Sequence, residues 1–504
     1  MVVADLNIRY AVGLVMLSSY GIRLTNVIST RPHVLVVDLD GTLTPSNSLV
    51  ELVLQLARRD PVKLVSLVWV LLTSGRLAFK CAVSDCIEAQ VDHWPWNPKV
   101  LDKIEAARLR ADTIVLMTAS DQRVASRVAD YLGGFDAVFG STPECNLKGI
   151  EKARLIATTY ADAKVTYIGD SNADRPVWEA VDTAIGVGID PRQVGNIAGQ
   201  SEELPKVRGQ RSVVWSILKA LRPHQWVKNV LLFVPLVLAQ VTAPSVYLLV
   251  CLGWIAFSFV ASAVYLFNDL MDLADDRAHP RKRNRPLASG YMPIEWGVIG
   301  VVALVTIGLG LAWILDAFFA LMLLGYLGLT TLYSLKLKRV AWVDVVTLSG
   351  LYTWRLLSGA VLAGVLISPW LFVFSLMCFL SLAGMKRITE LLDRIERGSD
   401  ATYGRDYAVE DWRSMAWLSG IALLSALVTF VLYLQVPTTA DLYPNIHALW
   451  WVVPVLSLWL GRMFWSTLSG RMHDDPIVYA AMDPLSWVSG LCVMVLMLRA
   501  SGLW

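Results

Sequence analysis

The sequence predicts a two-domain protein, in which a soluble α/β domain precedes an all-α domain of nine transmembrane helices. Two observations support this division. The 504 residues are 55% hydrophobic with a mean hydropathy of +0.52, more apolar than an ordinary soluble protein. Up to about residue 210 charged and apolar residues are mixed, whereas long apolar runs dominate the remainder. The formal net charge is only +2, so no nucleic-acid-binding tail is indicated.

We place the domain boundaries at these shifts in composition. Residues 1–30 are an N-terminal extension to which we assign no role, 31–200 the α/β domain, 201–214 a linker, and 215–504 the membrane domain. The six cysteines are scattered without a CxxC pair, so we expect neither a zinc site nor a disulfide framework.

The α/β domain opens with an apolar run, VLVVDLDGTLTPSN, that contains Asp38 and Asp40. This pattern is typical of a buried parallel strand that delivers carboxylates to its carboxyl end, where α/β sheets place their sites. Two more strand-like runs, TIVLMTAS and VTYIGDSNAD, also end in polar residues, and a lysine lies between them. The candidate residues that these segments add are Thr118, Lys148, Asp170 and Asp174.

The order DxDGT, hydroxyl, lysine, GDSxxD resembles the four motifs of the haloacid dehalogenase (HAD) phosphatase superfamily over roughly residues 32–200. The resemblance implies a Rossmann-like fold in which Asp38 is the nucleophile and Asp40 the general acid/base. It also implies that Thr118 and Lys148 hold the phosphoryl group. The Mg²⁺ ligands that it implies are Asp38, Asp40, Asp170 and Asp174. A carboxylate nucleophile divides phosphoryl transfer into two easier steps through an aspartyl-phosphate.

Residues 46–98, between the first and second motifs, contain two helical stretches with strong apolar faces. By the same resemblance they form a helical cap that would set substrate choice. One stretch within them, VKLVSLVWVLL, is too short to span a bilayer. It either packs in the cap core or rests on a membrane surface, and the sequence leaves both alternatives open.

Nine apolar runs follow, several of them close to the twenty or so residues that cross a bilayer. They cover residues 227–242, 245–267, 294–314, 317–335, 341–364, 368–385, 412–436, 446–467 and 484–500. The connecting loops on one side of this arrangement hold many Lys and Arg, whereas the opposite loops hold none. This asymmetry predicts a multi-pass protein of the cell (inner) membrane, with the α/β domain and both active sites on the cytoplasmic side.

The stretch NDLMDLADD, residues 268–276, places four carboxylates at the cytoplasmic end of the second run. Asp269, Asp272 and Asp276 are spaced three and four apart, so on a helix they would share one face. Like charges this close repel unless a cation lies between them, and oxygen ligands with room for substrate phosphates suit Mg²⁺. The sequence therefore predicts a second Mg²⁺ site here.

N-D-x-x-D-x-x-x-D after a second transmembrane run resembles the UbiA superfamily of intramembrane transferases, over about residues 215–504. The resemblance implies nine helices and a diphosphate substrate bound through Mg²⁺ by Asp269, Asp272 and Asp276. The further substrate-binding residues that it implies are Asn268, Arg285, Tyr333 and Lys338.

One departure from the superfamily pattern changes the expected donor. Aromatic prenyltransferases of the superfamily carry a second carboxylate motif, DxxxD, after the sixth helix, where this chain has GMKRITELLDRIERG with Lys386, Arg387 and Glu390. Basic side chains there suit a substrate that brings extra phosphate. An ordinary positive-inside loop would also contain such residues.

The strings LRPHQWVKN, NDLMDLADDRAHPRKRNRPLASG and MKRITEL resemble the decaprenyl-phosphate phosphoribosyltransferase branch of that superfamily. This resemblance implies 5-phosphoribosyl pyrophosphate as donor and a polyprenyl phosphate as acceptor, with Lys228 and Asn229 near the substrate. Arg355, a charge inside an apolar run, is expected to face the cavity and pair with a phosphate, with Asp344 as the alternative partner.

The two resemblances together suggest a bifunctional enzyme whose HAD domain removes the 5-phosphate from the lipid product. A short tether between the domains would keep the second site at high effective concentration. One alternative is a prenyltransferase that uses a prenyl diphosphate and a small or aromatic acceptor, fused to a phosphatase for an unrelated ester. Another is a non-enzymatic scaffold. The oligomeric state is left open.

Overall fold

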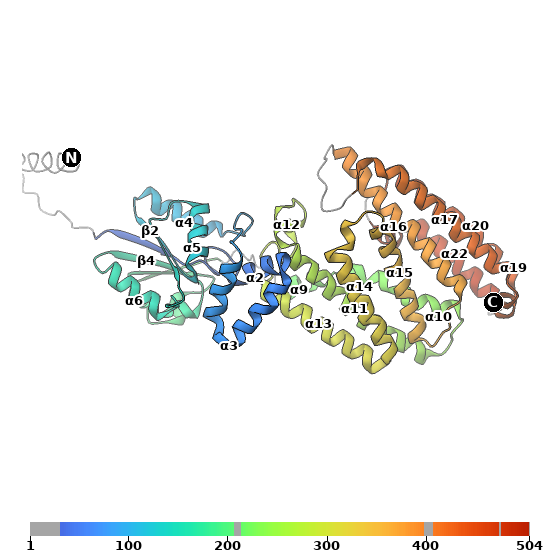
Figure 1. Ribbon diagram of the computed structural model, residues 1–504, viewed down its shortest axis with the longest axis horizontal. Helices are drawn as coiled ribbons and strands as arrows, with labels where there is room; N and C mark the ends of the chain where they lie inside the picture. Colours follow the sequence, from blue (N-terminus) through green and yellow to red (C-terminus); the bar gives the residue numbers. More distant parts are fainter. Residues whose placement is uncertain (1–30, 206–212, 398–406, 473–474, 503–504) are drawn as a thin grey trace, which may run out of the picture. The chain divides into compact units, whose positions relative to one another are not determined.

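A computed structural model describes residues 31–205, 213–397, 407–472 and 475–502. The chain divides into two compact units, Met1–Val207 and Arg208–Trp504 (Figure 1). We call the first the soluble unit and the second the membrane unit. The N-terminal extension assigned to residues 1–30 lies outside the described residues. The expected linker is shorter than 201–214, because a strand continues to Leu204 and a helix begins at Val213.

The first unit is built on a six-stranded parallel sheet with the strand order β3-β2-β1-β4-β5-β6. In chain order the strands are β1 (His33–Val37), β2 (Thr113–Asp121), β3 (Ala137–Ser141), β4 (Lys164–Gly169), β5 (Thr183–Val187) and β6 (Gln200–Leu204). The order reverses direction at β1, between β2 and β4. Open α/β sheets bind ligands at the carboxyl ends of the strands beside such a reversal.

Helices cover both faces of this sheet, and side chains of β1 alternate between two apolar cores. Leu35 and Val37 belong to one core and Val34 and Val36 to the other, as the two-residue period of a strand requires. The helices are α4 (Pro98–Leu109), α5 (Gln122–Leu132), α6 (Ile150–Thr159), α7 (Arg175–Trp178) and α8 (Pro191–Val194). A strand that is buried on both faces explains the continuous apolar run at residues 34–37.

The predicted cap is present as two helices between β1 and β2, α2 (Ser48–Arg59) and α3 (Pro61–Cys86). Asn47 caps α2 and Asp60 caps α3 through side-chain hydrogen bonds to backbone N–H groups. Helix α3 is interrupted at Gly75, whose φ of 81° is costly for any other residue. It therefore consists of a first limb, residues 61–74, and a second limb, residues 76–86.

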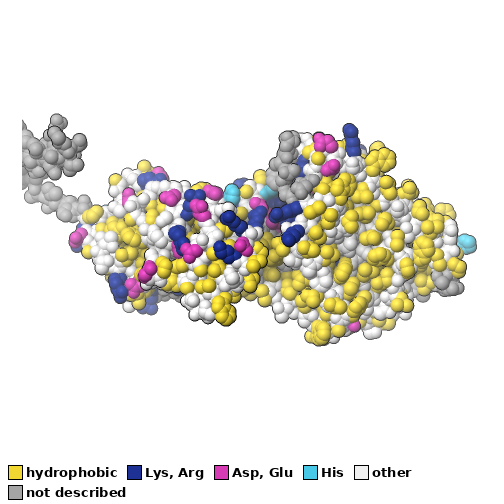
Figure 2. All heavy atoms as spheres, viewed as in Figure 1, with side chains coloured by type: hydrophobic (Ala, Val, Ile, Leu, Met, Phe, Trp, Pro, Cys, Tyr) yellow, Lys and Arg dark blue, Asp and Glu magenta, His cyan; other side chains and the backbone are white. Residues whose placement is uncertain are grey.

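The second unit is all-helical, and hydrophobic side chains cover most of its visible face (Figure 2). Its α-helices are α9 (Val213–Leu221), α10 (Val234–Leu238), α11 (Pro244–Met271), α12 (Leu273–Ala278), α13 (Ile294–Leu315), α14 (Ala317–Leu335), α15 (Val343–Leu362), α16 (Pro369–Arg397), α17 (Trp412–Leu434), α18 (Pro437–Leu442), α19 (Ile446–Trp450), α20 (Val452–Leu468), α21 (Pro476–Met482) and α22 (Pro484–Ala500). The 3₁₀ helices are η2 (Pro223–Phe233), η3 (Lys282–Asn284), η4 (Leu337–Arg339) and η5 (Val409–Asp411).

The expected count of nine transmembrane helices is not confirmed. Within the described residues, eight helices are long and apolar enough to cross a membrane, or nine if the bent pair α21–α22 is one span. One of the eight is α3, in the soluble unit. The first expected run, 227–242, instead forms η2 and the five-residue α10. Pro235 lies within this run and removes a backbone donor that a continuous α-helix over residues 227–242 would need.

Candidate active sites

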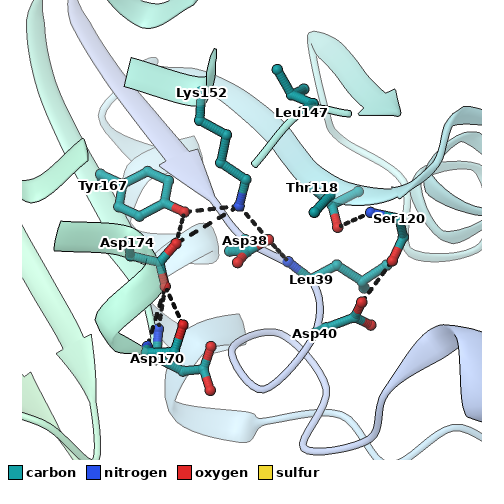
Figure 3. Close-up of polar contacts among 12 residues, drawn as sticks. Asp38, Leu39, Asp40, Thr118, Ser120, Leu147, Lys152, Tyr167, Asp170 and Asp174 are labelled. Carbon is teal, nitrogen blue, oxygen red and sulfur yellow. Dashed lines mark hydrogen bonds and ion pairs between the residues drawn. The ribbon is translucent and has the colours of Figure 1, made fainter. Parts of the chain in front are cut away.

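The carboxyl ends of β1 and β4 bring three carboxylates together in the soluble unit (Figure 3). Asp38 follows β1 directly, and Asp170 and Asp174 follow β4. One oxygen from each lies within 4.8 Å of the others, a spacing that a single divalent cation can bridge. The donor set is all oxygen, which fits Mg²⁺. The sequence identified all three residues as metal ligands.

The lysine of this site is Lys152, and the prediction of Lys148 was wrong. Lys152 lies on the first turns of α6, is 2% exposed, and places Nζ 2.8 Å from Oδ1 of Asp38 and 3.8 Å from Oδ1 of Asp174. It also donates to the hydroxyl of Tyr167, which in turn donates to Asp174. Lys148 precedes the helix and is exposed. The two lysines are four residues apart in NLKGIEK, and only the start of α6 decides which one faces Asp38.

Asp40 has different hydrogen-bond partners from the three carboxylates of the metal site. Its carboxylate accepts hydrogen bonds from the backbone N–H of Ser48 (2.8 Å) and the hydroxyls of Ser48 (3.1 Å) and Ser120 (2.6 Å). Among the described residues the carboxylate cluster includes Asp38 but not Asp40, so the expectation of Asp40 as a carboxylate ligand is not supported. Thr118 is fully buried at the end of β2 and accepts from the N–H of Ser120. The sequence analysis assigned no role to Ser48 or Ser120, because their contacts with Asp40 span 8 and 80 positions of the chain.

Asp38 is a buried carboxylate with other carboxylates close to it, and this affects its pKa. Burial raises the pKa of Asp38 to about 7, against the lowering effect of Lys152 and with a further rise from Asp174. A divalent cation would supply the charge that is lacking among these three carboxylates. The residues present therefore fit a bound Mg²⁺.

The cap contributes a further basic residue that sequence reasoning missed. Lys80, on the second limb of α3, donates a hydrogen bond to the carbonyl of Ala119 at the end of β2. Burial lowers the pKa of Lys80, while nearby Asp40 acts in the opposite direction. The cap thus places a cation beside the general acid/base candidate.

In the second unit, the three aspartates of the predicted Mg²⁺ face each contact a basic side chain. Asp269 accepts from Nη2 of Arg222 (2.6 Å) and Nη1 of Arg285 (3.0 Å). Arg285 also reaches Asp276 at 2.5 Å, and Nζ of Lys338 lies 3.3 Å from Asp272. Asp269 and Asp276 are buried, whereas Asp275 is exposed. The predicted substrate residues Arg285 and Lys338 are thus brought to the carboxylates, and Asn268 lies half-buried beside Asp269.

The helix that was expected to carry these aspartates is interrupted. Helix α11 ends at Met271, Asp272 lies between the helices, and α12 begins at Leu273. Within the described part of the chain, these aspartates do not form a cluster with oxygens close enough for one ion. A single shared helical face is therefore not what the structure shows, and Mg²⁺ binding here stays a prediction.

A second basic cluster forms around Asp475, a residue that no sequence motif marked as part of a site. Nζ of Lys228, on η2, lies 2.9 Å from Oδ2 of Asp475, and Nζ of Lys386, on α16, lies 2.8 Å from the same oxygen. The hydroxyl of Tyr352 is 3.4 Å from it, and Lys228 also lies over the Tyr352 ring. Two lysines that are far apart in sequence thus converge on one anionic oxygen.

Arg355 is buried, and its partner is not Asp344. Its guanidinium donates to Oδ1 of Asn229 (3.0 Å), the hydroxyl of Tyr326 (2.7 Å) and the carbonyl of Leu351 (2.9 Å). The alternative pairing with Asp344 was therefore wrong. Asn229, expected near the substrate, is fully buried and serves to hold Arg355.

Arg387 is the residue that pairs with Asp344, and this changes its expected role. It is 2% exposed in its side chain, lies 2.5 Å from both Asp344 and Glu390, and donates to the hydroxyl of Tyr333 at 3.2 Å. Tyr407 donates a second hydrogen bond to Asp344. Arg387, Glu390 and Tyr333 therefore form an internal network, and the expectation that Arg387 contacts substrate phosphate is not supported.

The second unit also contains an apolar cavity of about 360 Å³. Leu231, Cys378 and Phe379 are among its lining residues. Phe379 stacks on Tyr352 with ring centroids 5.3 Å apart, so one lining residue of the cavity contacts the tyrosine that lies beside Lys228. An apolar lining beside a basic cluster suits an amphiphile with an anionic head.

Comparison with known proteins gives two matching family models. The UbiA prenyltransferase family matches residues 230–487, and haloacid dehalogenase-like hydrolase matches residues 35–179. Protein y4nM of Sinorhizobium fredii is 37% identical over 466 residues, 91% of this chain and 89% of that protein. Decaprenyl-phosphate phosphoribosyltransferase of Mycobacterium tuberculosis is 36% identical over 186 residues, 36% of this chain and 61% of that protein. A solved UbiA homolog from Archaeoglobus fulgidus, bound to GPP and Mg²⁺, matches with a TM-score of 0.44 at 16% identity, covering 57% of this chain and 99% of that one.

Proposed function

Because this chain belongs to the UbiA prenyltransferase family and carries a haloacid dehalogenase-like hydrolase domain, we propose that it is a bifunctional membrane enzyme. Its membrane unit transfers the 5-phosphoribosyl group of phosphoribosyl pyrophosphate to a polyprenyl phosphate and releases diphosphate. Its soluble unit removes the 5-phosphate of the lipid product. The observation that carries the proposal is the convergence of Lys228 and Lys386 on one anionic oxygen, because Lys386 belongs to the segment where aromatic prenyltransferases have a second carboxylate motif.

The donor site is built from the carboxylates Asp269, Asp272 and Asp276 and the cationic side chains of Arg222, Arg285 and Lys338. Each carboxylate already meets a cation, so the group is close to neutral. Diphosphate oxygens compete for the cations, and the carboxylates that are released are the oxygen ligands that Mg²⁺ prefers. When bound there, Mg²⁺ would neutralise charge on the diphosphate.

The acceptor site places the lipid phosphate at the two lysines and the start of the polyprenyl chain in the apolar cavity. Asp475 occupies the position of the phosphate in the free protein, with its oxygen 2.9 and 2.8 Å from the two ammonium groups. A phosphate carries more charge and more acceptor oxygens than this carboxylate, so it can replace Asp475 between the lysines.

The transfer reaction joins the acceptor phosphate to the ribose that the donor site holds. An oxygen of the acceptor phosphate bonds to the anomeric carbon of the ribose as the bond from that carbon to the diphosphate oxygen breaks. The phosphate is already an anion, so no general base is needed, and the transition state has oxocarbenium character. Arg222 and Arg285 stabilise the departing diphosphate through charge-assisted hydrogen bonds.

In the soluble unit, Asp38 attacks the phosphorus of the 5-phosphate and forms an aspartyl-phosphate as the ester bond breaks. Asp40, held by Ser48 and Ser120, gives its proton to the leaving hydroxyl oxygen and then takes one from the water that hydrolyses the intermediate. Lys152 and Thr118 hold the phosphoryl oxygens. We further propose that both sites lie on the cytoplasmic side of the inner membrane, which the asymmetry of Lys and Arg in the loops supports.

The donor class is tested with membranes that contain the full chain. They are incubated with Mg²⁺, polyprenyl phosphate, a small aromatic acceptor and either phosphoribosyl pyrophosphate or a prenyl diphosphate, each labelled on the transferred group. Label from phosphoribosyl pyrophosphate in the lipid phase supports the proposal. Turnover of the prenyl diphosphate with a small acceptor, and none of phosphoribosyl pyrophosphate, would replace it with a prenyltransferase.

A further inference from the structure

The first limb of α3 exposes an apolar stripe that has no counterpart in the rest of the soluble unit. Val62, Val65, Trp69 and Leu72 are 79%, 72%, 69% and 73% exposed, and their three- and four-residue spacing puts them on one helical face. Val68, 44% exposed, borders this face. We call these five residues the α3 stripe. Figure 1 places α3 along the lower edge of the soluble unit, where Figure 2 shows hydrophobic side chains at the surface.

The stripe does not face the interior of the cap. Leu67 is buried in the core of the soluble unit, and Leu64 and Val70 pack against that core. These residues occupy the other side of the same limb, so it has two apolar faces and only one of them is covered. Elsewhere in residues 31–205 the exposed large hydrophobic residues are only Leu109, Tyr131 and Ile150, which are separated in sequence. A contiguous apolar patch of this kind marks an interaction surface.

Charge and length identify a lipid–water interface as the partner. Residues 64–75 contain no charged side chain, and exposed Arg59 and Lys63 precede them while exposed Arg76 follows. Cations at both ends of an apolar helical face suit the headgroups of anionic lipids. A limb of 14 residues is about 21 Å long, shorter than the roughly 30 Å hydrocarbon core, so it lies in the interface and does not span it.

The second limb anchors the first to the phosphatase site. Phe79 and Val83 of the second limb are buried in the soluble core, and Lys80 donates to the carbonyl of Ala119 beside Asp40. Because α3 is broken at Gly75, its first limb carries the exposed apolar surface and its second limb contacts the catalytic site. The same chain also contains a unit with several helices that are long and apolar enough to cross a membrane, so the cap belongs to a membrane protein.

We propose that the α3 stripe inserts into the lipid–water interface and holds the phosphatase site at the membrane surface. The inference goes beyond the proposed reactions, because it assigns a membrane-binding surface to the cap whatever ester the phosphatase cleaves. It gives the cap a function that suits an enzyme whose substrate remains in a bilayer.

The test uses the full chain in nanodiscs of phosphatidylethanolamine and phosphatidylglycerol, with the native cysteines replaced. A polarity-sensitive fluorophore is attached through Leu72→Cys or, as a matched control, through Leu109→Cys, since both leucines are highly exposed. We expect nitroxide-labelled acyl chains to quench the fluorophore at position 72 at least twofold more strongly than the one at position 109. Aqueous iodide should show the opposite order.

Three outcomes would overturn the proposal. Iodide quenching at position 72 as strong as at position 109 would mean that the stripe faces water. Protection of position 72 from both quenchers would mean that it packs on protein, either the membrane unit or a second copy. Equal lipid quenching at both positions would mean that the soluble unit adsorbs without using the stripe.

A second variant separates this surface from catalysis. Val65→Glu combined with Leu72→Glu should raise the KM for a long-chain lipid phosphate in vesicles about tenfold, and leave the hydrolysis of a soluble phosphate ester unchanged. The fluorescence result does not depend on any reaction, so failure of the proposed function would leave it interpretable. An unchanged KM for the lipid phosphate would contradict the proposal.

Discussion

The two acidic sites of this chain differ in how the negative charge of their three carboxylates is compensated. In the soluble unit three carboxylates lie close together, two of them contact one lysine, and burial raises the pKa of Asp38 to about 7. In the membrane unit three carboxylates meet three cationic side chains, Arg222, Arg285 and Lys338. The soluble site is thus prepared for a cation, whereas the membrane site is already neutral and must exchange partners when substrate arrives.

The difference follows from the surroundings of each site. Uncompensated charge is expensive where a protein is surrounded by lipid, so ionisable groups there pair with one another. In the soluble unit Asp38 and Asp174 are also buried, and there a bound proton relieves the repulsion, as the raised pKa of Asp38 indicates. The experiments below test this contrast, from the largest expected effect to the smallest.

Exchange of the buried lysine should have the largest effect. Lys152→Ala removes the cation that contacts Asp38, and we expect phosphatase kcat to fall by about 10²–10³-fold, as for the loss of one stabilising donor. Lys148→Ala is the matched control, because this lysine is exposed and precedes α6. Phosphate release from a soluble ester measures both. A loss with Lys148→Ala and not with Lys152→Ala would restore the assignment made from the sequence.

Disruption of the membrane carboxylates should come next. Asp269→Asn leaves Arg222 and Arg285 without their shared carboxylate, and we expect transfer to fall at least about 10²-fold because donor binding and metal binding both suffer. Asp275→Asn, in the same segment but on an exposed residue, should stay within about twofold. Incorporation of labelled ribose into lipid reports both variants, and phosphatase activity on a soluble ester should be unchanged in each. Equal effects of the two substitutions would remove Asp269 from the donor site.

The raised pKa of Asp38 predicts a pH dependence of metal binding. Because burial favours the protonated carboxyl, the proton must leave before a cation binds, so Mg²⁺ affinity should fall about tenfold for each pH unit below about 7 and level off above it. Calorimetric titration of Mg²⁺ between pH 5 and 8, in an Asp269→Asn background that disables the other site, measures this. An affinity that does not change between pH 5 and 7 would contradict the arrangement.

The smallest effect concerns the acceptor. Asp475→Asn removes the charge that competes with the lipid phosphate for Lys228 and Lys386, and we expect the KM for polyprenyl phosphate to fall about fivefold, equivalent to about 1 kcal/mol. Asp483→Asn breaks a comparable ion pair, with Arg462, and should leave this KM unchanged. A raised KM in the Asp475 variant would mean that this carboxylate positions the lysines and does not compete with substrate.

Local patterns in the sequence predicted the soluble fold and most of its site. Residues 34–37 and the polar residues that follow predicted a buried strand and its carboxylates, because strand ends and motif residues are close in sequence. The choice between Lys148 and Lys152 could not be predicted, because it depends on where α6 starts. In the membrane unit more contacts were not predicted. Asp475 and Lys228, for example, form an ion pair although they are 247 residues apart in the sequence, and no local pattern marks such a pair.

The central claim, that the two units act in sequence on one lipid, is tested most directly with doubly labelled donor. Phosphoribosyl pyrophosphate carrying ¹⁴C in the ribose and ³²P in the 5-phosphate is incubated with polyprenyl phosphate and either the unmodified protein or Asp38→Asn. With the unmodified protein we expect lipid that contains ¹⁴C and has lost ³²P, and with Asp38→Asn lipid that keeps both labels in equal amounts. Lipid that retains ³²P with the unmodified protein, or loses it at the normal rate with Asp38→Asn, would contradict the account.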